Sequence, residues 1–270
     1  MSLINQVFGR VLTVLPENNR IERIWKLSIV TFKKRYLDNR LGLLWALLNP
    51  MFRITVYYFV FTKIFDHNKV DNYALFLYVG LIVWMAFAEG TKRSINLFKV
   101  RKYLIENIQF NHMDLYLSLI LSVFFGLFFN WLVYCILVPF TGIYVDPLLL
   151  LNLPTLFLTL FLLALGTGII LSILSLFMKD ITHIWDMIIL VGFWTSGIFF
   201  QADQVDLPEF ELFSYVNPLI GLIENFRRVV FFGENPDFFM MYHNFIFGLV
   251  LYIIGYFAFK KYSHLILEKI

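Results

Sequence analysis

The feature that most constrains this chain is a series of long apolar runs. Residues 156–165 and 245–259, for example, contain no charged side chain. A helix needs about 20 mainly apolar residues to cross the hydrocarbon core of a bilayer. Spanning strands instead alternate in segments of about 10 residues, which these runs do not do. With 60% hydrophobic and 15% charged residues, the chain is predicted to be an all-α integral membrane protein.

The positions of Lys and Arg predict how the chain is oriented, because basic residues gather on the cytoplasmic side of membrane proteins. Residues 1–40 contain eight of them and residues 89–114 five, whereas residues 139–147 contain none. We therefore expect an inner-membrane protein with both termini in the cytoplasm. Six spans are expected, at about residues 41–65, 73–88, 115–138, 148–178, 184–200 and 239–259.

Residues 1–40 are expected to form a cytoplasmic segment ahead of the six-span domain, residues 41–270. In this segment Ile21, Trp25, Ile29, Phe32 and Tyr36 recur at helical spacing, opposite Arg23, Lys26, Lys33 and Lys34. This pattern predicts an amphipathic helix in the headgroup layer. The alternative is a plain juxtamembrane linker whose charges only set the topology.

A second helix outside the spans is predicted in the acid-rich segment after the fifth span. Asn217 is placed to cap its first turn, Pro218 suits the first helical position, and Gly233 follows the last turn. The helix is expected to be amphipathic rather than spanning. The fifth span itself is short and contains Gly192 and Gly197, so we expect it to be irregular or to cross the membrane incompletely.

The sequence lacks the motifs of several site classes. No glycine is followed by lysine, so the phosphate-binding P-loop is absent and ATP, if used, must be bound by another chain. The histidines are scattered without the spacing of a helical zinc site, and we expect neither a metal nor a nucleic-acid partner.

Charges within the spans are few, and two of them leave alternatives open. Arg53 is a candidate for facing a wet pathway or a partner chain, or for stabilising the helix near Pro50. His183 and Asp186 lie one helical turn apart and could form a proton relay, or could only be solvated at the interface.

Aromatic residues make up 19% of the chain, more than two interfacial belts need. Their flat apolar faces suit sugar rings that slide past without tight binding. For each ring, ordinary packing against lipid or core is the alternative. The candidates for lining a pathway are Tyr57, Tyr58, Phe61, Trp84, Phe87, Trp194, Phe199 and Phe200.

Several short motifs stand in an order that resembles a known family. Around the first span these are Arg35-Tyr36, Leu41-Gly42, Trp45, Pro50, Val56-Tyr57 and Val60-Phe61, and later Lys179-Asp180, Asn217-Pro218 and Arg228. The chain resembles the membrane subunits of ABC exporters for surface polysaccharides, which export O-antigen, capsule and teichoic acid. It departs from the family at Phe110-Asn111 and Gly197-Ile198, where a Phe-Pro and a Pro-Ile are usual.

The resemblance implies a homodimer paired with two copies of a separate ATP-binding subunit, which would hold ATP and Mg. Together they would move a lipid-linked glycan outward, so the chain would be a transporter subunit rather than an enzyme. The amphipathic helix and residues 91–112 would contact the ATPase, and residues 201–233 would form an external gate of short re-entrant helices.

The site residues follow from these assignments. Those expected to couple to the ATPase are Ser94, Lys99, Arg101, Lys102, Tyr103 and Glu106. Those of the interfacial helix and the start of the first span are Trp25, Lys33, Arg35, Tyr36, Gly42, Trp45 and Pro50. Those of the gate are Asn217, Pro218 and Arg228.

Two other functions are alternatives to the glycan exporter. An ABC permease for drugs or small lipids would share the topology but would not need a wide aromatic pore. A membrane-bound transferase would need acidic or histidine groups clustered near a membrane face, for which His112, His183 and Asp186 are the candidates.

Overall fold

The computed structural model describes residues 19–36, 41–64, 70–107, 111–201, 205 and 208–266. All regular structure in these ranges is helical, which confirms the predicted all-α fold. Within these residues, five helices are long and apolar enough to cross a membrane, which makes the chain a multi-pass membrane protein. They cover residues Leu44–Ile64, Tyr73–Ile95, Met113–Phe140, Leu149–Phe177 and Phe238–Tyr262.

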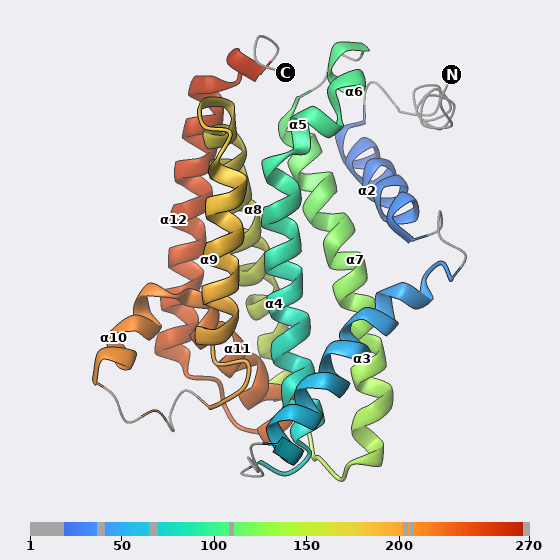
Figure 1. The fold of residues 1–270 in the computed structure, drawn as a ribbon, viewed down its shortest axis with the longest axis vertical. Coiled ribbons are helices and arrows are strands. Elements are labelled where there is room, and N and C mark those ends of the chain that lie inside the picture. Colours follow the sequence, from blue (N-terminus) through green and yellow to red (C-terminus); the bar gives the residue numbers. More distant parts are fainter. Residues whose placement is uncertain are drawn as a thin grey trace.

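The long helices form one bundle (Figure 1). Helices α4 (Tyr73–Ile95), α7 (Met113–Leu137), α8 (Leu153–Phe177), α9 (Ile181–Thr195) and α12 (Phe238–Tyr262) run side by side, while α3 (Leu44–Phe59) crosses them obliquely. Short turns extend three of them: a π-helical turn, Val60–Ile64, follows α3, a 3-10 turn, Val138–Phe140, follows α7, and another, Leu149–Asn152, precedes α8.

Helix α4 is the centre of the bundle and is buried along most of its length. It packs against α3, α7, α8, α9 and α11. The second span was predicted to end near residue 88, and the helix itself continues to Ile95. In this last part Glu89 is paired with Arg35 and Arg93. Two short helices follow, α5 (Leu97–Val100) and α6 (Lys102–Asn107).

Helix α9 is shorter than the five spans, as expected for the irregular fifth segment. Its 15 residues extend for about 22 Å at 1.5 Å per residue, against a hydrocarbon core of about 30 Å. Residues 196–200 continue from it as bends rather than helix, and Gly197 has a positive φ of 72°. Helix α9 therefore ends before it is long enough to cross the hydrocarbon core.

Helix α2 (Arg20–Tyr36) forms where a helix was predicted. Ile21 is 81% exposed and Trp25 52% exposed, so this apolar side is open to lipid, whereas Arg23, assigned to the polar face, is buried. Placement of the helix in the headgroup layer stays a prediction. Arg23 is buried because its guanidinium pairs at 2.6 Å with Asp114 in the first turn of α7. Arg20 binds the same carboxylate at 2.8 Å, so ionic contacts fix this end of α2 to the bundle.

Among the described residues between α9 and α12 are two short α-helices, α10 (Pro208–Val216) and α11 (Pro218–Arg227). Helix α11 begins as predicted, since the side chain of Asn217 accepts a hydrogen bond from the Leu219 amide at 3.2 Å. A π-helical turn, Arg228–Phe232, follows, and Gly233 ends it at a φ of 65°. The helix packs against α4, α8 and α12, while its half-buried Glu224 lines a separate cavity of about 360 Å³. Its amphipathic character stays a prediction.

Candidate functional site

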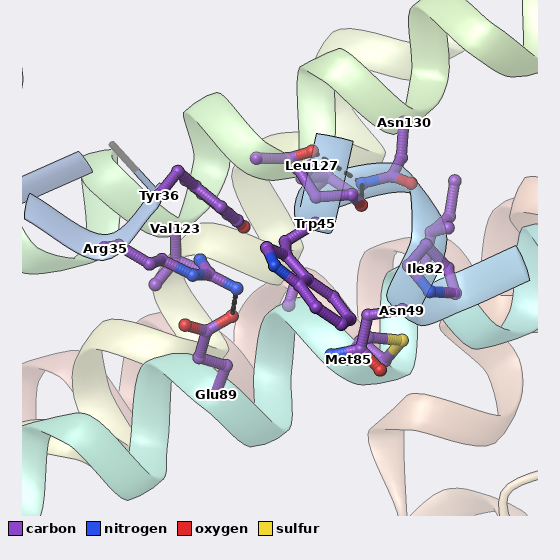
Figure 2. A pocket seen from close by; sticks show the side chains of 14 residues that line it. Arg35, Tyr36, Trp45, Asn49, Ile82, Met85, Glu89, Val123, Leu127 and Asn130 are labelled. Atoms are coloured by element: carbon purple, nitrogen blue, oxygen red, sulfur yellow. Dashed lines mark hydrogen bonds and ion pairs between the residues drawn. The ribbon is translucent and has the colours of Figure 1, made fainter. Parts of the chain in front are cut away.

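A cavity of about 240 Å³ lies where the end of α2 meets the start of α3, and we call it the α2–α3 cavity (Figure 2). Helices α4 and α7 form its other walls. Four residues singled out by the motif order, Arg35, Tyr36, Trp45 and Pro50, meet here. The other lining residues are Ala46, Asn49, Ile82, Met85, Ala86, Glu89, Val123, Gly126, Leu127 and Asn130.

The last turn of α2 reaches the wall of the cavity because α7 has a glycine there. A Cβ added at Gly126 would lie 3.3 Å from the Tyr36 hydroxyl, tighter than ordinary van der Waals contact. The guanidinium of Arg35 stacks on the Tyr36 ring at 4.5 Å, a favourable cation–π distance. Gly126 therefore makes room for the side chains that end α2.

Charge in the cavity is centred on one carboxylate. Glu89 pairs with Arg35 of α2 and, at 2.7 Å, with Arg93 of its own helix. Burial lowers the pKa of Arg35, an effect that the neighbouring Glu89 opposes. Burial also raises the pKa of Tyr36 to about 12, so the phenol stays neutral. Arg35 and Glu89 therefore place one cation and one carboxylate side by side in this wall of the cavity.

At the other side of the cavity, Asn130 compensates for the proline in α3. Pro50 has no N–H, so it cannot donate to the carbonyl of Ala46 one turn earlier. The side-chain amide of Asn130 donates to that carbonyl at 3.3 Å and to Gly126 O at 2.8 Å. Its carbonyl oxygen accepts from the Tyr78 hydroxyl at 3.1 Å. A backbone group within lipid must find a partner in the protein, and Asn130 supplies one.

The α2–α3 cavity can recognise a ligand by charge, hydrogen bonds and an aromatic face. In Figure 2 the Trp45 indole lies across the cavity, with the Arg35–Glu89 pair on one side and Asn49 and Met85 on the other. Within the described ranges, no three His, Cys, Asp or Glu side chains gather as metal ligands would.

Six of the eight aromatic candidates form one connected cluster around Phe193, a residue that was not predicted. Phe199 stacks on Phe61 at 4.8 Å and on Trp194 at 5.0 Å, and Phe193 contacts Tyr57, Trp84 and Phe199. Phe87 joins through Trp84 at 6.2 Å.

Most of these candidate rings are packed inside the single chain. Trp84, Phe87 and Phe199 are buried, Tyr57, Phe61 and Phe200 are partly buried, and Tyr58 and Trp194 are exposed. Pathway lining stays a prediction, and Tyr58 and Trp194 are the rings most open to a passing ligand.

The candidate coupling residues divide into two groups. Ser94 is buried at the end of α4 and donates to Gly90 O at 2.8 Å, and Arg101 is buried and bound to Thr31 of α2. Lys99, Lys102, Tyr103 and Glu106 are exposed on α5 and α6. Contact with an ATPase stays a prediction, and in this conformation the exposed four are the ones available for it.

The gate candidates tie α11 to the end of α9. Asn217 both caps α11 and donates its side-chain amide to the Ser196 hydroxyl at 3.0 Å, while Pro218 takes the first helical position. Arg228 pairs with Glu234 at 3.5 Å. A gating role for these residues stays a prediction.

The neighbouring arginine, Arg227, was missed by the sequence reasoning. It is fully buried and donates to Gly197 O and Ile198 O at 2.6 Å each, to Phe76 O at 3.2 Å and to Phe200 O at 3.4 Å. The Tyr73 hydroxyl donates to Phe199 O at 2.8 Å.

Burial lowers the pKa of Arg227 to about 10. The guanidinium of Arg227 and the hydroxyl of Tyr73 together donate to the carbonyls of residues 197–200, four successive groups in the non-helical segment after α9. One signal could have identified Arg227. It is a basic residue in a segment predicted to lie outside, where few Lys or Arg are expected.

Comparison with known proteins agrees with this architecture. Residues 22–231, from α2 to the π-helical turn after α11, match the family model described as ABC-2 type transporter. The chain is 28% identical over 239 residues to an O-antigen export system permease protein RfbA of Klebsiella pneumoniae, covering 86% of this chain and 88% of the relative. A protein of the same name from Myxococcus xanthus is 23% identical over 219 residues, covering 76% and 78%. The chain belongs to the ABC-2 type transporter family.

Proposed function

We propose that this chain is the transmembrane subunit of an ATP-driven exporter for a lipid-linked polysaccharide of the O-antigen, capsule or teichoic-acid type. The cargo would move from the cytoplasm to the outer side of the inner membrane. The observation that carries the proposal is the similarity to proteins named O-antigen export system permeases, which extends over 86% of this chain and 88% of the relative.

The active assembly is proposed to be a homodimer with two copies of a separate subunit that holds ATP and Mg. No glycine in this chain is followed by lysine, so a P-loop must come from a partner. Helices α3 and α9 support a dimer, since both carry exposed apolar side chains that a second copy would cover. Examples are Phe52 and Phe59 of α3, and Met187 and Val191 of α9.

Six crossings with both termini in the cytoplasm are proposed, with α9 and residues 196–200 together forming the fifth. Non-helical backbone is tolerated in a membrane only where its polar groups are paired within the protein. Arg227 and Tyr73 meet that condition for residues 197–200. Helices α10 and α11 would then return the chain to the outer side as the gate.

Motion from the ATPase is proposed to reach the spans through α2. Arg101, at the start of α6, is bound to Thr31 of α2, and Arg35 at the end of α2 is paired with Glu89 of α4. A push on α5 and α6 would therefore move α2 and α4 together. The α2–α3 cavity lies at the junction of these helices and would change shape with them.

The proposal is tested by deleting the gene and locating the glycan. We expect lipid-linked polymer to accumulate on the inner leaflet and surface glycan to be lost, with recovery on expression of the intact chain. The control is the intact chain with a partner subunit disabled in ATP hydrolysis, which should not restore export. Normal surface glycan in the deletion strain would contradict the proposal and favour a permease for drugs or small lipids.

A further inference from the structure

A second cavity, of about 500 Å³, lies between α2 and the junction of α4 with α5, and we call it the basic groove. These elements lie at the same end of the molecule (Figure 1). Among its lining residues are five cations and no acidic side chain. The cations are Lys34, Arg35, Lys92, Arg93 and Arg101.

Within the described residues, two carboxylates pair with three of these cations. Glu89 is shared by Arg35 and Arg93, and Lys92 pairs with Asp186 at 2.6 Å. Within the described part of the chain no carboxylate pairs with Arg101, which is only 7% exposed and binds the hydroxyl of Thr31. Burial, together with the neighbouring Arg93, lowers the pKa of Arg101 to about 10. A buried cation without a counter-ion is costly, and an anion in the groove would relieve that cost.

Topology alone does not explain why these cations converge. The positive-inside rule requires basic residues on the cytoplasmic side but does not require them to share one cavity. Lys33 and Lys99 come from the same segments and are exposed, yet neither lines the groove. Location on the cytoplasmic side therefore does not by itself account for five basic residues in one cavity.

The groove also has an apolar side. Leu27 and Val30 of α2 face Leu97 and Val100 across it, and Val100 is largely exposed. Arg and Lys bind phosphate by charge-assisted hydrogen bonds, while apolar walls suit the hydrocarbon next to a headgroup. We propose that the basic groove binds the phosphate headgroup of a membrane lipid. This inference goes beyond the proposed function, because it does not depend on the exported cargo.

The test compares two double variants of the full chain that remove the same charge. Lys34→Gln with Lys92→Gln removes two exposed cations of the groove, and Lys33→Gln with Lys99→Gln removes two exposed cations outside it. Binding to the purified chain in uncharged detergent would be measured for three probes. Phosphatidic acid carries both phosphate and acyl chains, diacylglycerol lacks the phosphate, and inorganic pyrophosphate lacks the chains.

We expect phosphatidic acid to bind well and the other two probes weakly. The groove variant should lose about tenfold or more in affinity, as expected for lost ionic hydrogen bonds, and the control variant about twofold or less, since exposed charges are screened. Unchanged thermal unfolding in both variants would show that the fold is intact.

Three outcomes would overturn the inference. Equal losses in both variants would indicate general electrostatic attraction, and pyrophosphate binding as tight as phosphatidic acid would indicate a site for free anions. No lipid binding, together with loss of a co-purified ATP-binding subunit from the groove variant, would assign the groove to that partner. None of these outcomes alters the glycan measurement in the deletion strain, so the two proposals fail separately.

Discussion

At the scale of single residues, Arg227 shows how this chain keeps non-helical backbone inside the bundle. When α9 ends at Thr195, the following carbonyls lose their helical partners, and each would be costly if left unpaired in an apolar environment. The planar guanidinium reaches three of them, at residues 197, 198 and 200, together with Phe76 O of α4. The buried guanidinium is thus stabilised by hydrogen bonds to backbone carbonyls rather than by a carboxylate.

This arrangement predicts a large difference between two adjacent arginines. Arg227→Met should destabilise the chain by about 3 kcal/mol or more, since each carbonyl left unpaired costs about 1–3 kcal/mol. The loss of stability in Arg227→Lys should be smaller than in Arg227→Met but still measurable, because an ammonium keeps the charge but lacks the planar arrangement of donors. Thermal unfolding of the purified protein in detergent would measure both.

Arg228→Met is the matched control. Arg228 is next in sequence but partly exposed, and it pairs with Glu234 at 3.5 Å. Loss of an exposed pair costs about 1 kcal/mol or less. If the Arg228 variant unfolds as readily as the Arg227 variant, the carbonyl contacts are not what stabilises this region.

At the scale of elements, α8 and α12 form the most extensive helix contact in the bundle. They approach closely because small residues lie between them, a common solution where helices pack in lipid. A Cβ at Gly166 of α8 would lie 2.5 Å from the backbone nitrogen of Tyr252, and one at Gly255 of α12 would lie 3.1 Å from Gly166 O. Backbone atoms cannot move aside as a side chain can.

The close contact of α8 and α12 predicts that substitution by alanine is less tolerated at Gly166 than at Gly248. Gly166→Ala should destabilise the chain by about 1–3 kcal/mol, the range for overpacking. Gly248→Ala should cost less, since its nearest contacts are side-chain carbons of Leu162 and Leu163 at 3.3 Å. Denaturation in mixed detergent would rank the two variants, and the reverse order would mean that α8 and α12 are further apart than described.

The elements also show where sequence patterns are sufficient and where they fail. The start of α11 was predictable because Asn217 and Pro218 act within one helical turn. The buried face of α2 was not, because it depends on Asp114, which is 91 residues from Arg23. The ion pair of Glu89 with Arg35 was not predictable for the same reason, since the two residues are 54 positions apart.

At the scale of the whole molecule, apolar run length predicted the membrane class, and five long helices confirm it. The candidate site was only partly predictable. Motif order singled out Arg35, Tyr36, Trp45 and Pro50, and these do meet in the α2–α3 cavity. Asn130 could not be predicted, because its role arises only when α7 lies beside the carbonyl that Pro50 leaves unpaired.

The orientation of the molecule gives the last prediction. In a Cys135→Ser background, which removes the single cysteine, new cysteines would replace Tyr144 on the α7–α8 link and Lys102 on α6. Both positions are exposed, so a membrane-impermeant maleimide can react with either once it has access. With Lys and Arg gathered inside, spheroplasts should be labelled at position 144, and position 102 should react only after permeabilisation.

The two positions control for each other, because each is expected to be labelled on one side of the membrane only. Inverted membrane vesicles should reverse the result, with position 102 reacting directly. Labelling of position 102 in intact spheroplasts would place α5 and α6 outside. It would also remove the basic groove from the cytoplasmic leaflet, since Lys92, Arg93 and Arg101 flank the same short helix. A cytoplasmic ATPase could then not reach α6, so this one measurement tests the premise shared by the coupling and export proposals.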